Sequence, residues 1–478
     1  MRFWTTITLI LVLSAVGLTY EIAAGRVLAP FFGTSLVTWT SVIATILTGF
    51  SLGSALGGLV AERDPAVAVG RVRLALVATA ALMAASPAVL GLIYGLGARN
   101  TGGMLLAVVL AFFPASVLVS FPSPFLAKMA VDARPGRAGS SLGLVLAAGS
   151  LGAIVGAVLA GFVALPLAGS VATFAGCGAV ALICAGLVRA GGAPGTGRLS
   201  RPDAVIAIAA GAVAVAAITA SGPLCRYESG MSCIDVQRSA GAAHLYSDRT
   251  QQAAERLVAQ GADRLTLPYA QWMWSRMDHD LGTAPSVLFI GGGGYTLPTM
   301  LLEARADARA VAVEIDPLIT RVVREALPWA GAMIDREAGP GGRLGIVHAD
   351  GRVYLNRTEQ RFDAVVMDAF SSGSVPAHLA THETYAHLRR IVDGPVYVNL
   401  IDEPDGALAR GIHAILRDLY PHVEAIQGPV SARGRANVLL AASDRPLGPV
   451  AAYPADYGPV RLAAGRAFTD DRGWIGHR

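Results

Sequence analysis

Charged residues are scarce in this chain, and the scarcity is uneven. Asp, Glu, Lys and Arg make up 15% of the 478 residues, while apolar residues make up 53%. A soluble globular protein carries about 25% charged residues, so a wholly soluble chain is excluded. The deficit lies in residues 1–220, whereas charges recur at ordinary density from Arg226 onward. This change predicts a membrane-embedded half followed by a soluble half.

Three further features are missing. The net charge is only +4 and no basic tract with interleaved aromatics is present, which argues against a nucleic-acid partner. The four cysteines include no C-x-x-C spacing, so no metal site of that kind is expected. The first apolar run is too long for a cleaved signal peptide, and no small-residue cleavage site is followed by soluble sequence.

Apolar runs long enough to cross a bilayer recur through the first half. A helix needs about 20 apolar residues to cross ~30 Å of hydrocarbon. About seven runs qualify: 5–31, 36–60, 69–97, 104–131, 141–164, 167–188 and 203–220. We therefore expect a multi-pass domain of about seven helices in a cell (inner) membrane, with the lipid bilayer as its partner.

Small residues and two ionisable residues stand out within these runs. Gly49 and Gly53, like Gly152 and Gly156, have the spacing that lets helix backbones approach closely. Glu21 and Arg26 lie in or at the end of the first run. Ionisable groups in lipid are costly, so they usually pair or line a polar cavity. Two interpretations stay open: contact with a substrate or lipid headgroup, or an interfacial pair that holds the first helix to its neighbours.

Positive charge alternates between the loops. Three loops are rich in it, with Arg63, Arg71 and Arg73, then Lys128, Arg134 and Arg137, then Arg189, Arg198 and Arg201. The loops between them carry only Arg26 and Arg99. The positive-inside rule then places the N-terminus in the cytoplasm, and seven crossings place the soluble half outside.

The four cysteines fall into two pairs. Cys177 and Cys184 lie inside an apolar run and are expected to be small core residues. Cys225 and Cys233 bracket a short loop after the last run. They are either a disulfide, if the loop faces an oxidising compartment, or two unrelated thiols.

Short β-rich runs alternate with helical stretches after residue 285. Five strands are expected at 286–290, 310–315, 344–348, 362–367 and 395–400. Helical segments, for example 318–327 and 381–391, lie between them. This alternation predicts a mostly parallel sheet with helices on both faces. Ligands of such folds bind at the carboxyl ends of the strands.

The expected strand ends carry a glycine loop and then acids. Gly291, Gly292, Gly293 and Gly294 follow the first strand and let a ligand approach the backbone closely. Glu314 follows Gly291 by 23 residues, close to the ~20 expected for an acid that binds ribose hydroxyls.

Two further acids continue this order. Asp350 ends the third strand, where it can accept a hydrogen bond from an adenine amino group, and Asp368 ends the fourth. The alternative interpretation is that these acids cap helix N-termini.

These motifs resemble the spermidine synthase family of aminopropyltransferases, and specifically its bacterial membrane-fused branch. The matching stretches are VLFIGGGG at 287–294, VEIDP at 313–317, HADG at 348–351, FDAVVMD at 362–368 and LATHETY at 379–385. Residues 227–234 resemble that family's small N-terminal β-domain, and 19–35 resemble the first-span signature of the fused branch. The resemblance implies a class I methyltransferase-like, Rossmann-type fold of the spermidine synthase type after a polytopic α-helical membrane domain.

The resemblance also implies residue roles. Glu314 would hold a ribose and Asp350 would read an adenine. Asp368 would be the catalytic base or electrostatic partner of an attacking amine. The residues that would contact the S-adenosyl co-substrate are Gly291, Gly292, Gly293, Glu314, Asp316, Asp350 and Gly351, and those on the substrate side are Tyr269 and Tyr385.

The sequence departs from the family pattern in the polyamine half of the site. The family's glycine loop carries an Asp that contacts the aminopropyl ammonium, and here this position is Gly294. The acid that follows the catalytic Asp is missing from 369–372, and Gln271 stands where a Glu is expected. A diamine carries two positive charges, so the nucleoside half of the site is better supported than the polyamine half.

Two function hypotheses follow. The first is a membrane-anchored transferase that moves an aminopropyl or related group from decarboxylated S-adenosylmethionine, or S-adenosylmethionine, to a small amine acceptor. The alternative is a non-catalytic transporter or sensor whose soluble domain binds a nucleoside or polyamine. The loop charges place the soluble half outside, whereas sulfonium nucleosides are made inside cells, and this conflict stays open. The sequence indicates no oligomeric state.

No metal is expected. His378 and His382 are four residues apart, but no third ligand has suitable spacing and the order is not H-E-x-x-H. We therefore expect surface or hinge histidines. The expected domains are 1–221 (membrane), 222–284 (small β-subdomain), 285–445 (nucleoside-binding α/β) and 446–478 (C-terminal tail).

Overall fold

The computed structural model describes most of the chain and divides it into two compact units. The described residues are 2–33, 36–189, 205–206, 209–214, 216–217, 225–369, 375–431, 434–450, 453–454 and 456–472. The first unit is Met1–Cys233 and the second is Ile234–Arg478.

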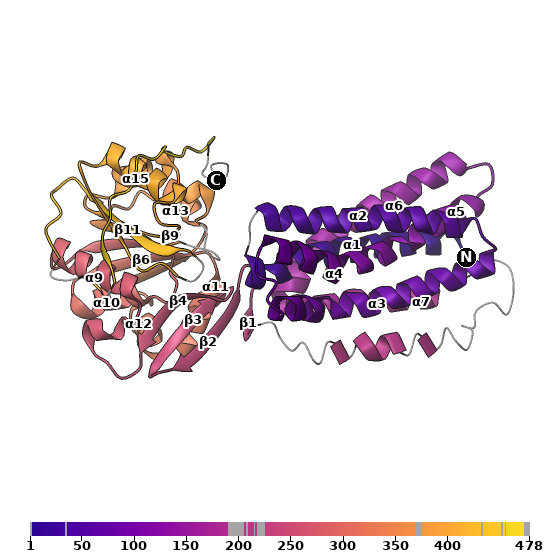
Figure 1. The fold of residues 1–478 in the computed structure, drawn as a ribbon, viewed down its shortest axis with the longest axis horizontal. Helices are drawn as coiled ribbons and strands as arrows, with labels where there is room; N and C mark the ends of the chain where they lie inside the picture. Colours follow the sequence, from indigo (N-terminus) through magenta and orange to yellow (C-terminus); the bar gives the residue numbers. More distant parts are fainter. Residues whose placement is uncertain are drawn as a thin grey trace. The chain divides into compact units, whose positions relative to one another are not determined.

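The first unit is a bundle of long apolar helices (Figure 1). These are α1 (Phe3–Phe32), α2 (Leu36–Ala61), α3 (Pro65–Gly95), α4 (Thr101–Ser120), α5 (Pro122–Asp132), α6 (Ala138–Leu159) and α7 (Leu165–Leu187), with a π-helical turn at Ala160–Ala164 between the last two. Five helical segments in the described residues are long and apolar enough to cross a membrane. They indicate a multi-pass membrane protein.

The fifth segment differs from the expected pair of separate helices. It runs as one helical stretch of 50 residues, Ala138–Leu187, and contains both expected runs, 141–164 and 167–188. At 1.5 Å per residue it would extend about 75 Å, more than twice the hydrocarbon thickness. Its backbone leaves the helical region at Gly169 (φ 79°, ψ 174°), which divides it into two helical stretches. The seventh expected run, 203–220, falls largely outside the described residues.

Glycines bring the helix backbones together. Helix α2 packs on α4 and α1 packs on α6. A Cβ atom at Gly53 would lie 2.0 Å from the Val117 carbonyl oxygen, and one at Gly152 would lie 2.1 Å from that of Leu11. The predicted close approach at these glycines is therefore confirmed, and it rests on the absence of a side chain.

The second unit contains a large sheet built mostly from parallel strands. The expected strands appear as β5 (Ser286–Ile290), β6 (Arg309–Glu314), β7 (Leu344–His348), β8 (Ala364–Met367) and β9 (Val396–Asp402). They pair in parallel in the order β7-β6-β5-β8-β9, which in chain order is 3-2-1-4-5. This is the order of a doubly wound Rossmann-type sheet, so the predicted fold class is confirmed.

Three strands extend this sheet beyond the predicted ones. They are β10 (His422–Gln427), β11 (Ala436–Ser443) and β12 (Gly458–Pro459), and they pair antiparallel beyond β9. The described part of the segment after residue 446 thus supplies a strand. It also supplies Phe468, which is 3% exposed in the hydrophobic core.

Helices connect the strands. They are α10 (Thr296–Ala304), α11 (Pro317–Ala326), α12 (Pro328–Glu337), α13 (Gly351–Arg357), α14 (His382–Ile391) and α15 (Ala407–Leu419), with short 3-10 turns at Gly261–Arg264 and Ala377–Leu379. The 3.6-residue periodicity is strong in α11 and α15, where buried Ile and Val or Leu side chains form one stripe.

A smaller antiparallel sheet and one helix precede the large sheet. The strands are β1 (Tyr227–Glu228), β2 (Cys233–Ser239), β3 (Ala242–Ser247) and β4 (Thr250–Arg256), followed by helix α9 (Pro268–Asp280). In this sheet β3 pairs with β2 on one side and with β4 on the other.

The glycine packing of α2 is testable with a matched pair of variants. Gly53→Ala places a Cβ against the Val117 carbonyl, whereas Gly58→Ala, five residues further along the same helix, has no atom within 4 Å to meet. We expect Gly53→Ala to lower the stability of the membrane unit by roughly 1–3 kcal/mol and Gly58→Ala to leave it unchanged or slightly higher. Thermal unfolding of the detergent-solubilised chain measures both, and equal melting temperatures would contradict the packing described.

Candidate functional site

The glycine loop lies between β5 and α10 and touches the end of β8. Gly291 has φ +104°, and a Cβ atom there would lie 2.3 Å from the Asp368 carbonyl oxygen. Gly293 also has a positive φ, +49°. Only glycine tolerates both the conformation and the contact at Gly291, so this residue lets the loop lie against Asp368, which directly follows β8.

Glu314 ends β6 and holds the glycine loop in place. Its side chain is 5% exposed, and one oxygen, Oε2, accepts hydrogen bonds from the N–H groups of Gly292 and Gly293, both at 3.0 Å. The other oxygen, Oε1, accepts from the Asp316 N–H at 2.9 Å. Burial raises the pKa of the Glu314 carboxyl, and these backbone donors oppose the shift.

Asp316 and Asp350 cap helices. Asp316 accepts a hydrogen bond from the Leu318 N–H at 3.0 Å, at the start of α11. Asp350 Oδ1 accepts from the N–H groups of Arg352 and Val353, at 2.8 and 3.1 Å, at the start of α13. Both residues therefore act as helix caps. The second carboxylate oxygen of Asp350, Oδ2, takes no part in its cap.

That second oxygen of Asp350 lies 3.0 Å from Nε2 of His378. The His378 side chain is 49% exposed and that of Asp350 is 30% exposed, so this contact lies at the surface. Gly351 follows, and a Cβ atom there would lie 2.7 Å from Cγ2 of Ile290, which places the start of α13 directly against the end of β5.

Asp368, which directly follows β8, is a half-buried acid of the site. Its Oδ1 accepts a hydrogen bond from Nδ2 of Asn399 at 2.8 Å, and its carboxyl is also hydrogen-bonded to the Tyr269 hydroxyl. Burial raises the pKa of Asp368 to about 6, and the bonds from Asn399 and Tyr269 oppose that rise. The carboxyl is therefore mostly ionised at pH 7 and still basic enough to take a proton.

The Tyr269 hydroxyl has two acceptors in reach. It lies 3.2 Å from the Gln252 carbonyl oxygen and is hydrogen-bonded to Asp368. Burial, together with the neighbouring Asp368 charge, raises the pKa of Tyr269 well above its ordinary value. The hydroxyl has one proton, so it donates to one of these two acceptors at a time.

Asn399 was missed by the sequence reasoning. It lies within the apolar run of β9 and is 3% exposed, and its own Oδ1 accepts from Nδ2 of Asn437 at 2.9 Å. The available signal was one amide side chain in a strand that otherwise reads as buried, because a buried polar group needs a partner. That partner is Asp368.

Tyr295 was also missed. It has the left-handed conformation (φ 55°) directly after the glycine loop and is fully buried. Its hydroxyl lies 2.6 Å from that of Thr320, which in turn lies 2.9 Å from Nε2 of His348. A Cβ atom at Gly292 would lie 2.9 Å from the Tyr295 ring, so the ring packs on the loop.

The space beside Gly294 is occupied. A Cβ atom at this position would lie 2.1 Å from the Ala253 Cβ of β4. The sequence has glycine here, where the family pattern has Asp, and β4 occupies the space that a side chain at position 294 would need.

The remaining predicted residues lie elsewhere. Tyr385 is 1% exposed and belongs to the hydrophobic core with Leu388 and Ile412. His382 pairs with Asp418 on the surface, with 3.0 Å between Nε2 and Oδ2. In the part of the chain that the structure describes, no three His, Cys, Asp or Glu side chains gather as metal ligands would.

Comparison with known proteins identifies polyamine aminopropyltransferases as relatives. Such proteins from Ruegeria sp. and Vibrio vulnificus are 31% and 27% identical to this chain over 109 residues. Polyamine aminopropyltransferase 2 from Pseudomonas aeruginosa is 30% identical over 171 residues. These matches take up 23%, 22% and 33% of this chain.

The matches are partial on both sides. The chain spans 37%, 33% and 46% of the length of these three relatives. No family model matches the chain.

Solved structures were compared as well. A probable spermidine synthase from Corynebacterium glutamicum is 20% identical, with a TM-score of 0.40, and covers 47% of this chain and 81% of its own. Spermidine synthase from Thermotoga maritima is 16% identical, with a TM-score of 0.37, and covers 52% of this chain and 80% of its own. The sequence similarity to the aminopropyltransferases, over 109 to 171 residues, supports a spermidine synthase-like family.

Proposed function

We propose that this chain is a membrane-anchored transferase of the spermidine synthase type. It moves an aminopropyl or related group from decarboxylated S-adenosylmethionine, or from S-adenosylmethionine, to a small amine. The observation that carries the proposal is the position of Asp368 directly after β8: its backbone carbonyl oxygen meets the glycine loop at Gly291, and its half-buried carboxyl is held by Asn399 and has its pKa raised to about 6. A basic carboxyl at a strand end is what an attacking amine requires.

The described residues fit a sulfonium nucleoside as co-substrate. The loop at Gly291 offers bare backbone beside Asp368. Oε1 of Glu314 accepts only one hydrogen bond, so it retains a lone pair for a ribose hydroxyl. Oδ2 of Asp350, which is part-exposed, can accept from an adenine amino group.

The proposed reaction balances with Asp368 as proton acceptor. The lone pair of the amine forms a C–N bond to the carbon next to the sulfonium. The C–S bond breaks, its electron pair stays on sulfur, and methylthioadenosine leaves. The proton released by the amine passes to the Asp368 carboxylate, which Asn399 and Tyr269 hold in place.

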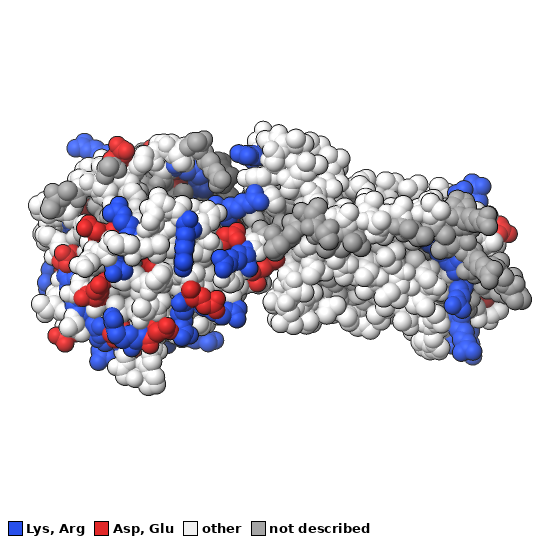
Figure 2. Space-filling view, turned by 90° about the horizontal axis from the view of Figure 1, so that it is seen from below, with Lys and Arg blue, Asp and Glu red and all other residues white. Residues whose placement is uncertain are grey.

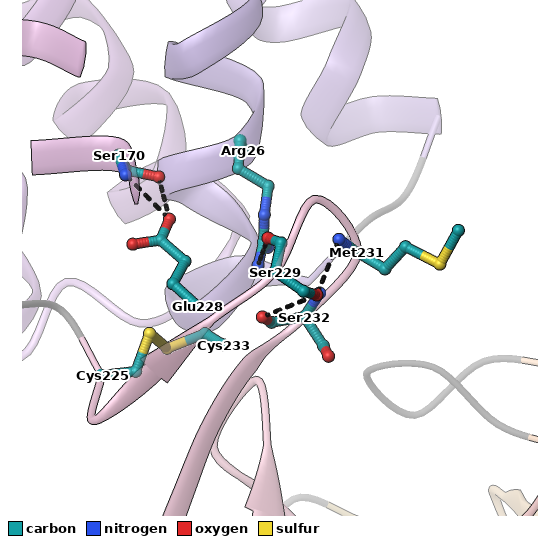
Figure 3. The surroundings of a disulfide bond; sticks show 8 residues. All are labelled: Arg26, Ser170, Cys225, Glu228, Ser229, Met231, Ser232 and Cys233. Carbon is teal, nitrogen blue, oxygen red and sulfur yellow. Dashed lines mark hydrogen bonds between the residues drawn. A yellow bond between two sulfur atoms is a disulfide. The ribbon is translucent and has the colours of Figure 1, made fainter. Parts of the chain in front are cut away.

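The charges of the first unit also support an orientation in the proposed cell membrane. The Arg-rich loops follow α2 and α5, at the end of the bundle where α1 begins, and Lys and Arg side chains gather at one end of the helical unit (Figure 2). The opposite end carries the loop between Cys225 and Cys233, whose sulfurs form a disulfide with a Cα–Cα distance of 5.6 Å (Figure 3).

Contacts fix the disulfide loop to that opposite end. Glu228 Oε1 accepts hydrogen bonds from the N–H of Ser170, at 3.0 Å, and from its hydroxyl. Arg26, near the end of α1, donates to the Ser229 carbonyl at 3.4 Å (Figure 3). Disulfides persist in oxidising compartments, so we propose that residue 234 and the soluble unit begin on the non-cytoplasmic side and that the donor is used there.

The role of Asp368 is tested by Asp368→Asn in the full-length chain. We expect methylthioadenosine release to fall by about 10²–10⁴-fold while the donor still binds, because the amide keeps the shape of the carboxyl and cannot take a proton. In the wild type, kcat/KM for a donor and amine is expected to fall as pH drops below about 6, where Asp368 becomes protonated. Mass spectrometry of the released nucleoside and calorimetric binding measure these quantities.

His382→Gln is the control, because His382 lies in a surface pair with Asp418. This variant is expected to keep the wild-type turnover and the same fall in kcat/KM at low pH. Turnover by Asp368→Asn at the wild-type rate would remove Asp368 from the reaction. Loss of donor binding and turnover together would make its role structural.

The steric contact at Gly294 makes a second test. Gly294→Asp alone is expected to destabilise the soluble unit by roughly 1–3 kcal/mol, because its side chain meets Ala253. The pair Ala253→Gly with Gly294→Asp relieves this contact and places a carboxylate on the loop. We expect the pair to shift donor preference toward decarboxylated S-adenosylmethionine, whose chain ends in an ammonium without a carboxylate.

Gly339→Asp is the matched control, since nothing lies within 4 Å of a Cβ atom there. Denaturation of the full chain and competition between the two donors provide the measurements. A Gly294→Asp chain as stable as Gly339→Asp would show that β4 does not occupy this space.

The orientation is tested with reporter fusions at two positions. A fusion after Arg478 is expected to be active with a reporter that folds only outside the cytoplasm, and a fusion after Arg134 only with a cytoplasmic reporter. The Arg134 fusion is the internal control, because it follows α5 at the Arg-rich end. Cytoplasmic activity at both positions would contradict the proposed orientation and place the disulfide pair in a reducing compartment.

A further inference from the structure

A cavity of about 360 Å³ lies within the helix bundle of the first unit, between α1, α2, α4, α5 and α6. Its volume falls in the ~300–1,000 Å³ range of small-molecule sites. The polar groups that line it are the Glu21 carboxyl and the hydroxyls of Ser14, Ser54, Ser120 and Ser123. Every other lining residue is apolar or glycine.

Glu21 lies deep in the expected hydrocarbon layer. It is 18 residues after the first residue of α1 and 11 before the last, which corresponds to about 27 Å and about 16 Å along the helix axis. A carboxyl at such a depth is costly unless it meets a proton or a cation, and intramembrane acids usually mark a ligand or ion site.

The bundle supplies no partner for this carboxyl. Within the described ranges no hydrogen bond or ion pair engages Glu21. Arg26, one turn further along α1, donates instead to the Ser229 carbonyl. The expected alternative of a Glu21–Arg26 pair is therefore not what the structure contains.

The cavity opens sideways on the bundle. Leu47, on its rim in α2, is 49% exposed, while Leu18 and Phe50 are half-buried. On a membrane-spanning helix this outer surface faces lipid, so the entrance faces the acyl chains of the bilayer. A molecule that reaches the cavity by this entrance has to be soluble in the bilayer.

We propose that this cavity binds an amphiphilic amine, a single ammonium group carried on an alkyl chain. Its ammonium would pair with Glu21 and donate its other hydrogens to serine oxygens of the lining, while the alkyl chain would lie along the leucine side chains toward the opening. A polyamine fits poorly, because its second charge has no acid to meet. A neutral lipid leaves the carboxyl unpartnered. The proposal does not depend on the transferase reaction.

The experiment compares three probes on the full-length chain in detergent. Radiolabelled n-octylamine is expected to bind saturably at one site per chain. Its neutral counterpart n-octanol is expected to bind on the order of tenfold or more weakly, since one charge-assisted contact is lost. The diamine 1,4-diaminobutane is expected not to compete.

Variants test whether the preference for octylamine over octanol depends on the Glu21 carboxyl. Glu21→Gln is expected to lower octylamine affinity on the order of tenfold and to leave octanol binding unchanged, and Glu21→Asp to keep part of the preference. Glu62→Gln is the matched control, because Glu62 is exposed just after α2 and does not line the cavity. Asp368→Asn is expected to bind octylamine normally, which separates this site from the proposed transferase site.

Three results would overturn the proposal. Equal binding of octylamine and octanol to the wild type would show apolar partitioning only, and this result needs no variant to fold. An unchanged preference in Glu21→Gln would remove the carboxyl from the site. Dissociation of a dimer by Glu21→Gln, with no octylamine binding in the wild type, would assign the opening to a second copy of the chain.

Discussion

The contact between Gly291 and the Asp368 carbonyl is the constraint on which the α/β site depends. The loop that follows β5 can touch Asp368, the residue after β8, only because Gly291 has no side chain. Once they touch, the positions of the other groups follow from the parallel pairing of β5 with β6 and β8. Glu314 accepts hydrogen bonds from the loop amides, and Asp368 lies half-buried directly after β8. Burial raises the pKa of Asp368, and the hydrogen bonds from Asn399 and Tyr269 oppose that rise.

The membrane unit uses the same constraint for a different purpose. In lipid no hydrophobic force draws helices together, so contact area decides which helices pack. The glycines of α2 and α6 bring backbone against backbone and form tight pairs with α4 and α1. The cavity beside Glu21 lies among α1, α2, α4, α5 and α6. The same helix bundle thus contains both tightly packed helix pairs and a space large enough for a small ligand.

Much of the α/β unit followed from sequence because its signals are local. Each of the five parallel strands is a short apolar run, and each of these acids lies at a strand end or within two residues of one. Their order along the chain was therefore enough to predict the positions of Glu314, Asp350 and Asp368. The antiparallel strands β10 to β12 lacked such a marker. Asn399 and Tyr295 were missed because their importance lies in contacts across the fold, with Asp368 and with Thr320. Gly169 was not singled out because a single left-handed glycine in an apolar run resembles any other.

The loop closed by Cys225 and Cys233 has a consequence for anyone who prepares this protein. The two residues are eight apart, and both lie at the end of the first unit, directly before the second unit begins at Ile234. A host that keeps thiols reduced, or a buffer with a strong reductant, yields a chain in which the Cys225–Cys233 disulfide is absent. Samples made under different redox conditions then differ in whether Cys225 and Cys233 are thiols or a disulfide. Comparisons between laboratories therefore require this state to be stated.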